Sequence, residues 1–289
     1  MPARTLVLCL LALALPAGAE PVPVVVSVLP QKCVVDAIGG ERVVTRVVVG
    51  PGQSHAAYEP TPRQMVELSR ARVYFRIGMS FEPGWLERVR ATNPAIEVID
   101  QRKGLPLRPD PAGHAHEDEH GEPLGAYAGN DPHVWTSPAL LERMASQVHA
   151  VLTRLDPAGA PAYAGRLEAW RAALAALDQE IRRTLAGLQT RTFLVYHPAW
   201  GYFAETYGLQ QVAIEHEGKE PGARSLAAII EGARRAGVQT VLVQRQFPAA
   251  SAEAVARAIG ARLVVLDPLA EDCLGSLRAV AQALAGGGG

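Results

Sequence analysis

Short β-branched runs alternate with helical segments along almost the whole chain, and one central helical pattern is much longer than the others. The runs at 24–29 and 43–49 are apolar and end at Pro30 and Gly50, which is typical of buried strands. Helical patterns at 61–69 and elsewhere separate such runs. This alternation predicts parallel sheets with helices on their faces.

The longest helical pattern covers residues 155–188. Its apolar positions recur at steps of three and four residues: Leu167, Trp170, Leu174, Leu177, Ile181 and Leu185. A helix of about 30 residues would be roughly 45 Å long, more than a crossover within one domain needs. Strand and helix patterns then restart at residue 193. We therefore predict an α/β fold of two lobes, each a mostly parallel sheet flanked by helices, joined by one long rigid helix, with a cleft between the lobes.

The N-terminus has the pattern of a cleaved signal peptide. Arg4 precedes an apolar run of about ten residues, too short to span a membrane, and small residues follow at 17–19. Cys9 lies inside this run, which argues against a lipid anchor, so we expect an exported periplasmic protein beginning near Glu20. The expected segments are a signal peptide at 1–19, a first lobe at 20–154, the linking helix at 155–188, a second lobe at 189–285 and a Gly tail at 286–289.

The charge of the chain bears on its binding partners, and its cysteines bear on disulfide formation. The chain has 28 Lys and Arg against 29 Asp and Glu, so nothing favours nucleic acid, and we expect a monomer. Cys33 and Cys273 would remain after signal-peptide cleavage. In an oxidising compartment they form either one disulfide or two separate buried thiols, and the sequence leaves both alternatives open.

Four side chains of the kind that bind metals stand at strand ends or in turns. His55, His197 and Asp267 each follow a predicted strand, and His133 lies in a turn before a helix. Ligands of open α/β sheets bind outside the carboxyl ends of the strands. Three imidazoles and one carboxylate would suit tetrahedral zinc. Taken singly, each is more simply explained as a turn residue.

Other polar residues near these positions have more than one explanation each. Asp131 and Glu59 either orient ligand imidazoles or form turns. Residues 215–217 (Glu-His-Glu) bind the metal directly, support a ligand or are solvated. The segment 114–122, with three His and four acids, is either a low-affinity metal collector or a solvated charged loop. Trp135 and Trp200 flank two of the candidate ligands and either exclude water or belong to the core.

Several motifs follow one another along the chain: Ser27-Val28-Leu29-Pro30-Gln31, Pro51-Gly52 to Pro62, Phe81-Glu82 to Trp85-Leu86, Asn130-Asp131-Pro132-His133-Val134-Trp135, Tyr207-Gly208-Leu209 and Asp267-Pro268-Leu269. These motifs give the whole mature chain a resemblance to the metal-binding components of ABC importers, the ZnuA/TroA-type periplasmic proteins (cluster A-I). This resemblance implies two lobes with a metal in the interlobe cleft. By motif position, His55, His133 and His197 match the family's histidine ligands. Asp267 matches a carboxylate that is a ligand in some members.

The third ligand position distinguishes zinc from manganese within this family. Manganese-type members carry Glu where this chain has His197, and an oxygen-rich set suits manganese. The resemblance therefore implies a periplasmic zinc-binding protein, not an enzyme, that delivers Zn²⁺ (alternatively Mn²⁺) to an ABC importer permease in the inner membrane. The alternatives are a manganese- or iron-binding homologue, an adhesin-like relative, a zinc chaperone for periplasmic enzymes and, least favoured, a zinc hydrolase. The hydrolase is disfavoured because the sequence has no HExxH motif.

Overall fold

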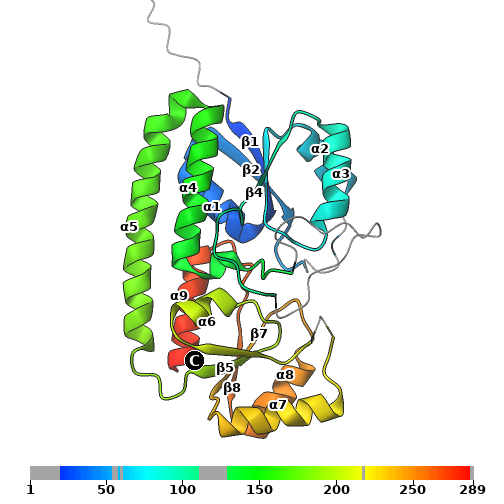
Figure 1. Ribbon diagram of the computed structural model, residues 1–289, viewed down its shortest axis with the longest axis vertical. Coiled ribbons are helices and arrows are strands. Elements are labelled where there is room, and N and C mark those ends of the chain that lie inside the picture. The colour runs from blue at the N-terminus through cyan, green and yellow to red at the C-terminus, as the bar shows by residue number, and fades with distance from the viewer. Residues whose placement is uncertain (1–19, 54–57, 59–60, 111–128, 217–218, 287–289) are drawn as a thin grey trace, which may run out of the picture.

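A computed structural model describes residues 20–53, 58, 61–110, 129–216 and 219–286. It contains two parallel sheets of four strands each, one above the other in Figure 1. The first has the order β2-β1-β3-β4 and the second β6-β5-β7-β8. The predicted fold class is confirmed. The expected signal peptide, His55, Glu59, the 114–122 segment and Glu217 lie outside the described residues.

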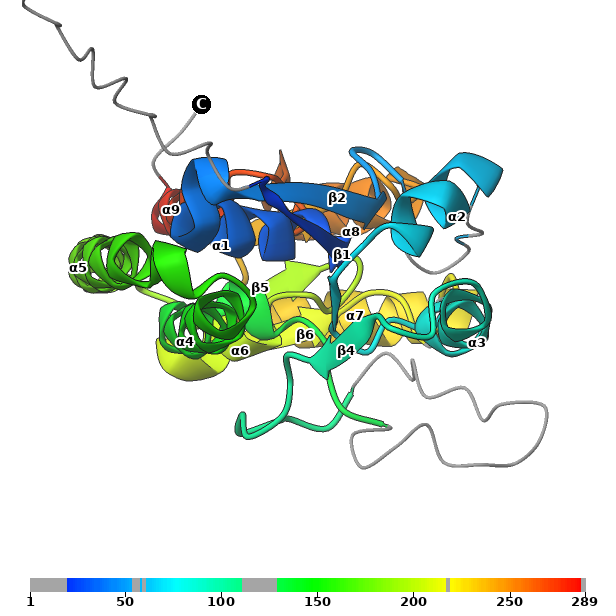
Figure 2. The ribbon, with the colours of Figure 1, turned by 90° about the horizontal axis from the view of Figure 1, so that it is seen from above.

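The strands of the first sheet are β1 (Val22–Val28), β2 (Val43–Val49), β3 (Val73–Arg76) and β4 (Glu97–Asp100). Helices α1 (Leu29–Gly39), α4 (Pro138–Leu155) and α5 (Ala160–Leu185) cover one face, and α2 (Pro62–Ser69) and α3 (Glu82–Thr92) cover the other (Figure 2). The 3-10 turns η1 (Gly40–Arg42), η2 (Val134–Thr136) and η3 (Pro157–Gly159) join these elements. Both faces of the sheet are covered, which explains the nearly continuous apolar sequence of β1.

The second sheet contains β5 (Thr192–Val195), β6 (Gln210–Ala213), β7 (Thr240–Val243) and β8 (Arg262–Val265). Helices α6 (Gly201–Thr206) and α9 (Cys273–Ala285) lie on one face, and α7 (Ala223–Arg235) and α8 (Ala250–Ile259) on the other (Figure 1). Successive side chains of a strand point to opposite faces. Accordingly Phe193 and Val195 join the large core shared with α5 and α9, whereas Leu194 joins a smaller core with α7 and α8.

Helix α5 spans both lobes but is shorter than the predicted 155–188. Pro157 disfavours helical geometry at the residue before it, so helix α4 ends at Leu155 and Asp156 is its C-cap. The turn η3 follows, and α5 begins at Ala160. Its apolar stripe is buried as predicted, from Tyr163 to Leu185. Helix α4 packs alongside α5. The sequence predicts a helix after His133 but not its bounds or this packing. No helix among the described residues is both long and apolar enough to cross a membrane.

Candidate metal centre

His133 and His197 come from different lobes and meet in the structure. His133 lies in the loop before η2, and His197 lies just after β5; their ring centroids are 5.3 Å apart. His133 is 1% exposed and His197 is 4% exposed. The sequence placed both near one cleft, and the structure brings these two together. Whether His55 joins them lies outside the described residues.

Each imidazole is held by a buried carboxylate at one ring nitrogen. His133 Nδ1 donates to Asp131 Oδ1 at 2.8 Å, and His197 Nδ1 donates to Glu215 Oε1 at 2.8 Å. An ionised carboxylate only accepts hydrogen bonds, so the proton belongs on Nδ1 in both rings. This tautomer leaves the lone pair on Nε2, and a carboxylate partner makes an imidazole a stronger metal ligand. The contact anticipated for Asp131 is present, and of the 215–217 group Glu215 takes the supporting position.

Local packing keeps the Asp131–His133 pair in place. The Tyr202 hydroxyl donates to the Asp131 carbonyl at 2.8 Å, and burial raises its pKa, so it stays protonated. Gly201 lies against the same carboxylate: a Cβ added there would come within 2.9 Å of Asp131 Oδ2. The absence of a side chain at this position therefore allows α6, from the second lobe, to approach the first lobe closely.

Asp267 does not line the pocket that contains the two histidines, but it bonds two residues that do. The pocket holds about 270 Å³, including space open to solvent, and is lined by His133, His197, Gln244, Gln246, Phe247, Pro268 and Leu269. Asp267 Oδ2 accepts a hydrogen bond from Gln246 Nε2 at 2.9 Å, and Oδ1 accepts one from the Leu269 amide at 2.9 Å. Its carboxylate is thus fixed at the edge of the pocket by two residues that line it.

The loop between β7 and α8 supports the site and was not foreseen. Gln244 bonds the backbone of His197 twice, accepting from its amide at 3.3 Å and donating to its carbonyl at 2.8 Å. The Phe247 ring stacks on the His197 imidazole, with centroids 5.0 Å apart and an interplanar angle of 19°. Glutamine and phenylalanine are not typical metal ligands. Only their position directly after a buried strand indicated that they could lie at a binding site.

Trp135 and Trp200, left open between two roles, are both buried in the large core. Trp135 also reaches the site: its ring meets that of His133 edge-on at 5.2 Å. Among the residues that the structure describes, no group of three or more His, Cys, Asp or Glu side chains is gathered closely enough to hold a metal ion.

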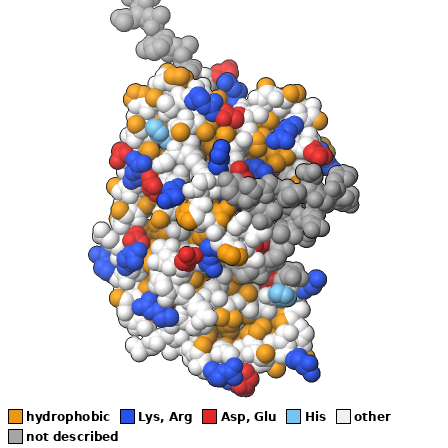
Figure 3. All heavy atoms as spheres, in the orientation of Figure 1, with side chains coloured by type: hydrophobic (Ala, Val, Ile, Leu, Met, Phe, Trp, Pro, Cys, Tyr) orange, Lys and Arg blue, Asp and Glu red, His pale blue; other side chains and the backbone are white. Residues whose placement is uncertain are grey.

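Positive and negative side chains are mixed over the molecular surface (Figure 3). On the face shown in Figure 3, basic and acidic side chains are interspersed. This agrees with the nearly balanced charge of the whole chain, 28 basic against 29 acidic residues.

Comparisons with known proteins find similar sequences and structures among zinc-uptake proteins. The family model described as "Zinc-uptake complex component A periplasmic" matches residues 24–286. A high-affinity zinc uptake system protein ZnuA of Bacillus subtilis is 29% identical over 217 residues, 73% of this chain and 67% of its own length. The corresponding protein of Paracoccus denitrificans is 29% identical over 247 residues, 75% of this chain and 74% of its own. A crystal structure of ZnuA has a TM-score of 0.83 and 36% identity, covering 93% of this chain and 99% of that one.

Proposed function

The chain belongs to the family of periplasmic A components of zinc-uptake complexes, and from this premise we propose that it captures one zinc ion between its lobes and delivers it to the permease of an ABC importer. The family consists of periplasmic metal-binding components of ABC metal importers. The choice of zinc, the ligand residues and the delivery step are our proposal.

One observation carries the proposal. His133 of the first lobe and His197 of the second lie with ring centroids 5.3 Å apart, and each is bound at Nδ1 by a buried carboxylate. A carboxylate at Nδ1 fixes the orientation of an imidazole and makes it a stronger metal ligand. Two such pairs facing each other across a lobe boundary support a transition-metal site.

The proposed ligands are His55, His133, His197 and Asp267. Three imidazole nitrogens and one carboxylate oxygen form the tetrahedral set that zinc favours, whereas manganese favours more oxygen ligands. The carboxylate offsets part of the charge of the ion and closes the shell against water. A closed shell suits binding and transfer better than catalysis, because a catalytic zinc keeps one position for water.

The test is metal analysis of the protein that starts at Glu20, before and after dialysis against a weak chelator. We expect one zinc per chain in the wild type and none in the His55→Ala/His133→Ala/His197→Ala variant. His149→Ala is the matched control, because His149 is only partly buried, on α4, away from the pocket. Retention of stoichiometric zinc by the triple variant would refute the ligand assignment. A preference for Mn²⁺ over Zn²⁺ in direct competition would refute the choice of metal.

Delivery needs a separate experiment. Zinc-loaded protein should drive ATP-dependent zinc uptake by its importer in proteoliposomes, and the triple variant should not. Equal uptake with free zinc and with the loaded protein would favour a chaperone that supplies periplasmic enzymes.

A further inference from the structure

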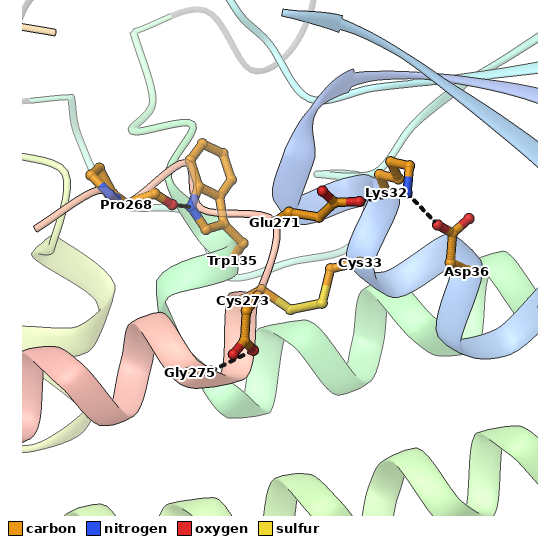
Figure 4. Close-up of a disulfide and its surroundings, with 9 residues drawn as sticks. Lys32, Cys33, Asp36, Trp135, Pro268, Glu271, Cys273 and Gly275 are labelled. Atoms are coloured by element: carbon orange, nitrogen blue, oxygen red, sulfur yellow. Dashed lines mark hydrogen bonds and ion pairs between the residues drawn. A yellow bond between two sulfur atoms is a disulfide. The ribbon is translucent and has the colours of Figure 1, made fainter. Parts of the chain in front are cut away.

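The segment of residues 267–273, called here the interlobe segment, connects β8 to α9 and so belongs in sequence to the second lobe. It begins with Asp267 and ends with Cys273, the first residue of α9. Three of its residues contact the first lobe: Pro268, Glu271 and Cys273 (Figure 4). The candidate ligand Asp267 thus lies at one end of a short piece of chain that is tied to the opposite lobe.

The contact nearest to Asp267 is a buried hydrogen bond. Trp135 Nε1 donates to the carbonyl oxygen of Pro268, the next residue after Asp267, at 2.8 Å. Trp135 is 2% exposed and its ring also meets His133 edge-on, at 5.2 Å. Losing the donor would leave the Pro268 carbonyl without this partner in a dry environment, which is costly. One side chain of the first lobe therefore contacts a candidate ligand and fixes the backbone beside another.

The far end of the segment is fixed covalently. Cys273 forms a disulfide with Cys33 on α1 of the first lobe, with Cα atoms 6.3 Å apart and a sequence separation of 240 residues. The neighbouring residue Lys32 pairs with Glu271 at 2.6 Å. The Glu271 side chain is 58% exposed, so this ion pair adds little. The buried hydrogen bond from Trp135 and the disulfide are therefore the two strong attachments of the interlobe segment to the first lobe.

The second lobe holds Asp267 through its backbone carbonyl, which accepts from Ser276 Oγ at 3.0 Å, and through the side chain of Gln246, which donates to Oδ2. The bond from Gln246 fixes the carboxylate, and neither bond reaches the first lobe. A carboxylate that completes a metal shell must be held within about 0.5 Å of its productive position. The direct ties between this segment and the lobe that carries His133 are the Trp135 hydrogen bond and the disulfide.

We infer that the first lobe positions the ligand carboxylate of Asp267 through Trp135 and the Cys33–Cys273 disulfide. The inference rests on the proposed function, since it takes Asp267 as a ligand. These two attachments tie the backbone next to Asp267 to the lobe that carries His133. The disulfide is therefore a positioning element of the metal site in addition to a stabilising cross-link.

The experiment is a double-mutant cycle on zinc affinity, measured by competition with a chromophoric chelator in the absence of thiols. Cys33→Ser/Cys273→Ser should weaken zinc binding by about tenfold, the lower end of the range for groups that orient metal ligands. In an Asp267→Ala background the same change should cost less than about twofold, the usual error of additivity. In the metal-free protein, amide exchange at 269–273 should be faster without the disulfide.

Trp135→Phe gives a second cycle should the cysteine variant fail to fold, because it keeps an aromatic ring beside His133 and removes the donor to Pro268. Val255→Ala is the control for lost stability, since Val255 is fully buried in the smaller core with α7 and α8. It should lower the melting temperature and leave zinc affinity unchanged.

Unchanged affinity in folded variants, or an equal loss with and without Asp267, would overturn the inference while leaving the proposed zinc site intact. Absence of zinc from the wild type would overturn both. A loss of affinity in Val255→Ala as large as in the cysteine variant would show that general stability is responsible, and this too would overturn the inference.

Discussion

At the scale of single residues, both oxygens of the Asp267 carboxylate accept hydrogen bonds from neighbouring residues. Gln246 donates to Oδ2 and the Leu269 amide donates to Oδ1. A carboxylate has about four lone-pair positions, so both bonds are compatible with metal ligation. The two donors fix the plane of the carboxylate and so determine which lone pair could face an ion.

The Asp267→Ala variant should bind zinc at least tenfold more weakly, about 1.4 kcal/mol. The reason is that three neutral imidazoles alone leave the double charge of the ion uncompensated in a partly dry site. A zinc titration against a competing chelator measures the change. Glu253→Ala, which removes an ion-paired carboxylate on α8, should bind like the wild type. Wild-type affinity in Asp267→Ala would show that Asp267 is only a neighbour of the site.

Glu215 is the carboxylate that orients the His197 imidazole. It is 4% exposed, and it bonds His197 Nδ1 at 2.8 Å. The Glu215→Gln variant keeps the shape but removes the negative charge that strengthens the imidazole as a ligand. Zinc affinity should fall by about ten- to a hundredfold. Glu220→Gln, at an exposed position after β6, is the matched control. Equal affinities for the two variants would mean that the carboxylate does not support a ligand.

At the scale of secondary-structure elements, Asp156 organises the junction of α4 and α5. It is the C-cap residue of α4 and accepts two hydrogen bonds from Arg42, at 2.7 and 2.8 Å, and one from the Tyr163 hydroxyl at 2.6 Å. The Arg42 guanidinium, followed by the Tyr163 hydroxyl, lowers the pKa of Asp156 from 3.8 to about 2. This carboxylate thus joins η1, α4 and α5.

The lowered pKa makes part of the stability depend on pH. A carboxyl group whose pKa is lower in the folded state stabilises the fold above its unfolded pKa. For Asp156 this contribution is complete above pH 3.8 and is lost as the pH falls through about 2. Asp156→Asn should therefore be less stable than the wild type at pH 7, and the difference should shrink below pH 3.8. Denaturant unfolding at several pH values measures it. A constant difference from pH 7 to pH 2 would contradict the assigned cause.

The elements themselves were largely predictable, for local reasons. The strand at 43–49 was expected with its observed bounds, because the β-branched run is bounded there by charged residues and by glycine. The start of α5 was expected too early, because the effect of Pro157 on Asp156 is a backbone restriction that side-chain periodicity does not report. Contacts between distant segments, such as Gln246 with Asp267, leave no periodic trace in the sequence.

The disulfide shows the same limit at the element scale. The oxidising compartment permitted it, and Cys33 and Cys273 stand near the ends of elements in different lobes. The two alternatives could be separated only by the distance between Cα atoms, which depends on how α1 and α9 pack. The structure places these atoms 6.3 Å apart and forms the bond.

At the scale of the whole molecule, the two lobes share one hydrophobic core. Residues of β1 and α1 from the first lobe, and of β5 and α9 from the second, belong to the same buried cluster, which also includes the apolar stripe of α5. The interlobe segment and the contact of Tyr202 with Asp131 add polar and covalent ties across the boundary. Rotating one lobe against the other would expose several of these side chains, at about 1.5–3 kcal/mol for each large aliphatic one.

Zinc binding should therefore leave the overall dimensions of the protein almost unchanged. A ligand shifts a conformational equilibrium only by its difference in affinity for the two states, and exposing the shared core would consume most of that difference. Small-angle X-ray scattering of the chain from Glu20 should give a radius of gyration of about 18 Å, equal within error with and without zinc. His197→Ala, which should not retain the ion, controls for aggregation caused by free zinc. A reproducible contraction on adding zinc, reversed by a chelator and absent from His197→Ala, would show that the lobes close as hinged bodies in spite of the core they share.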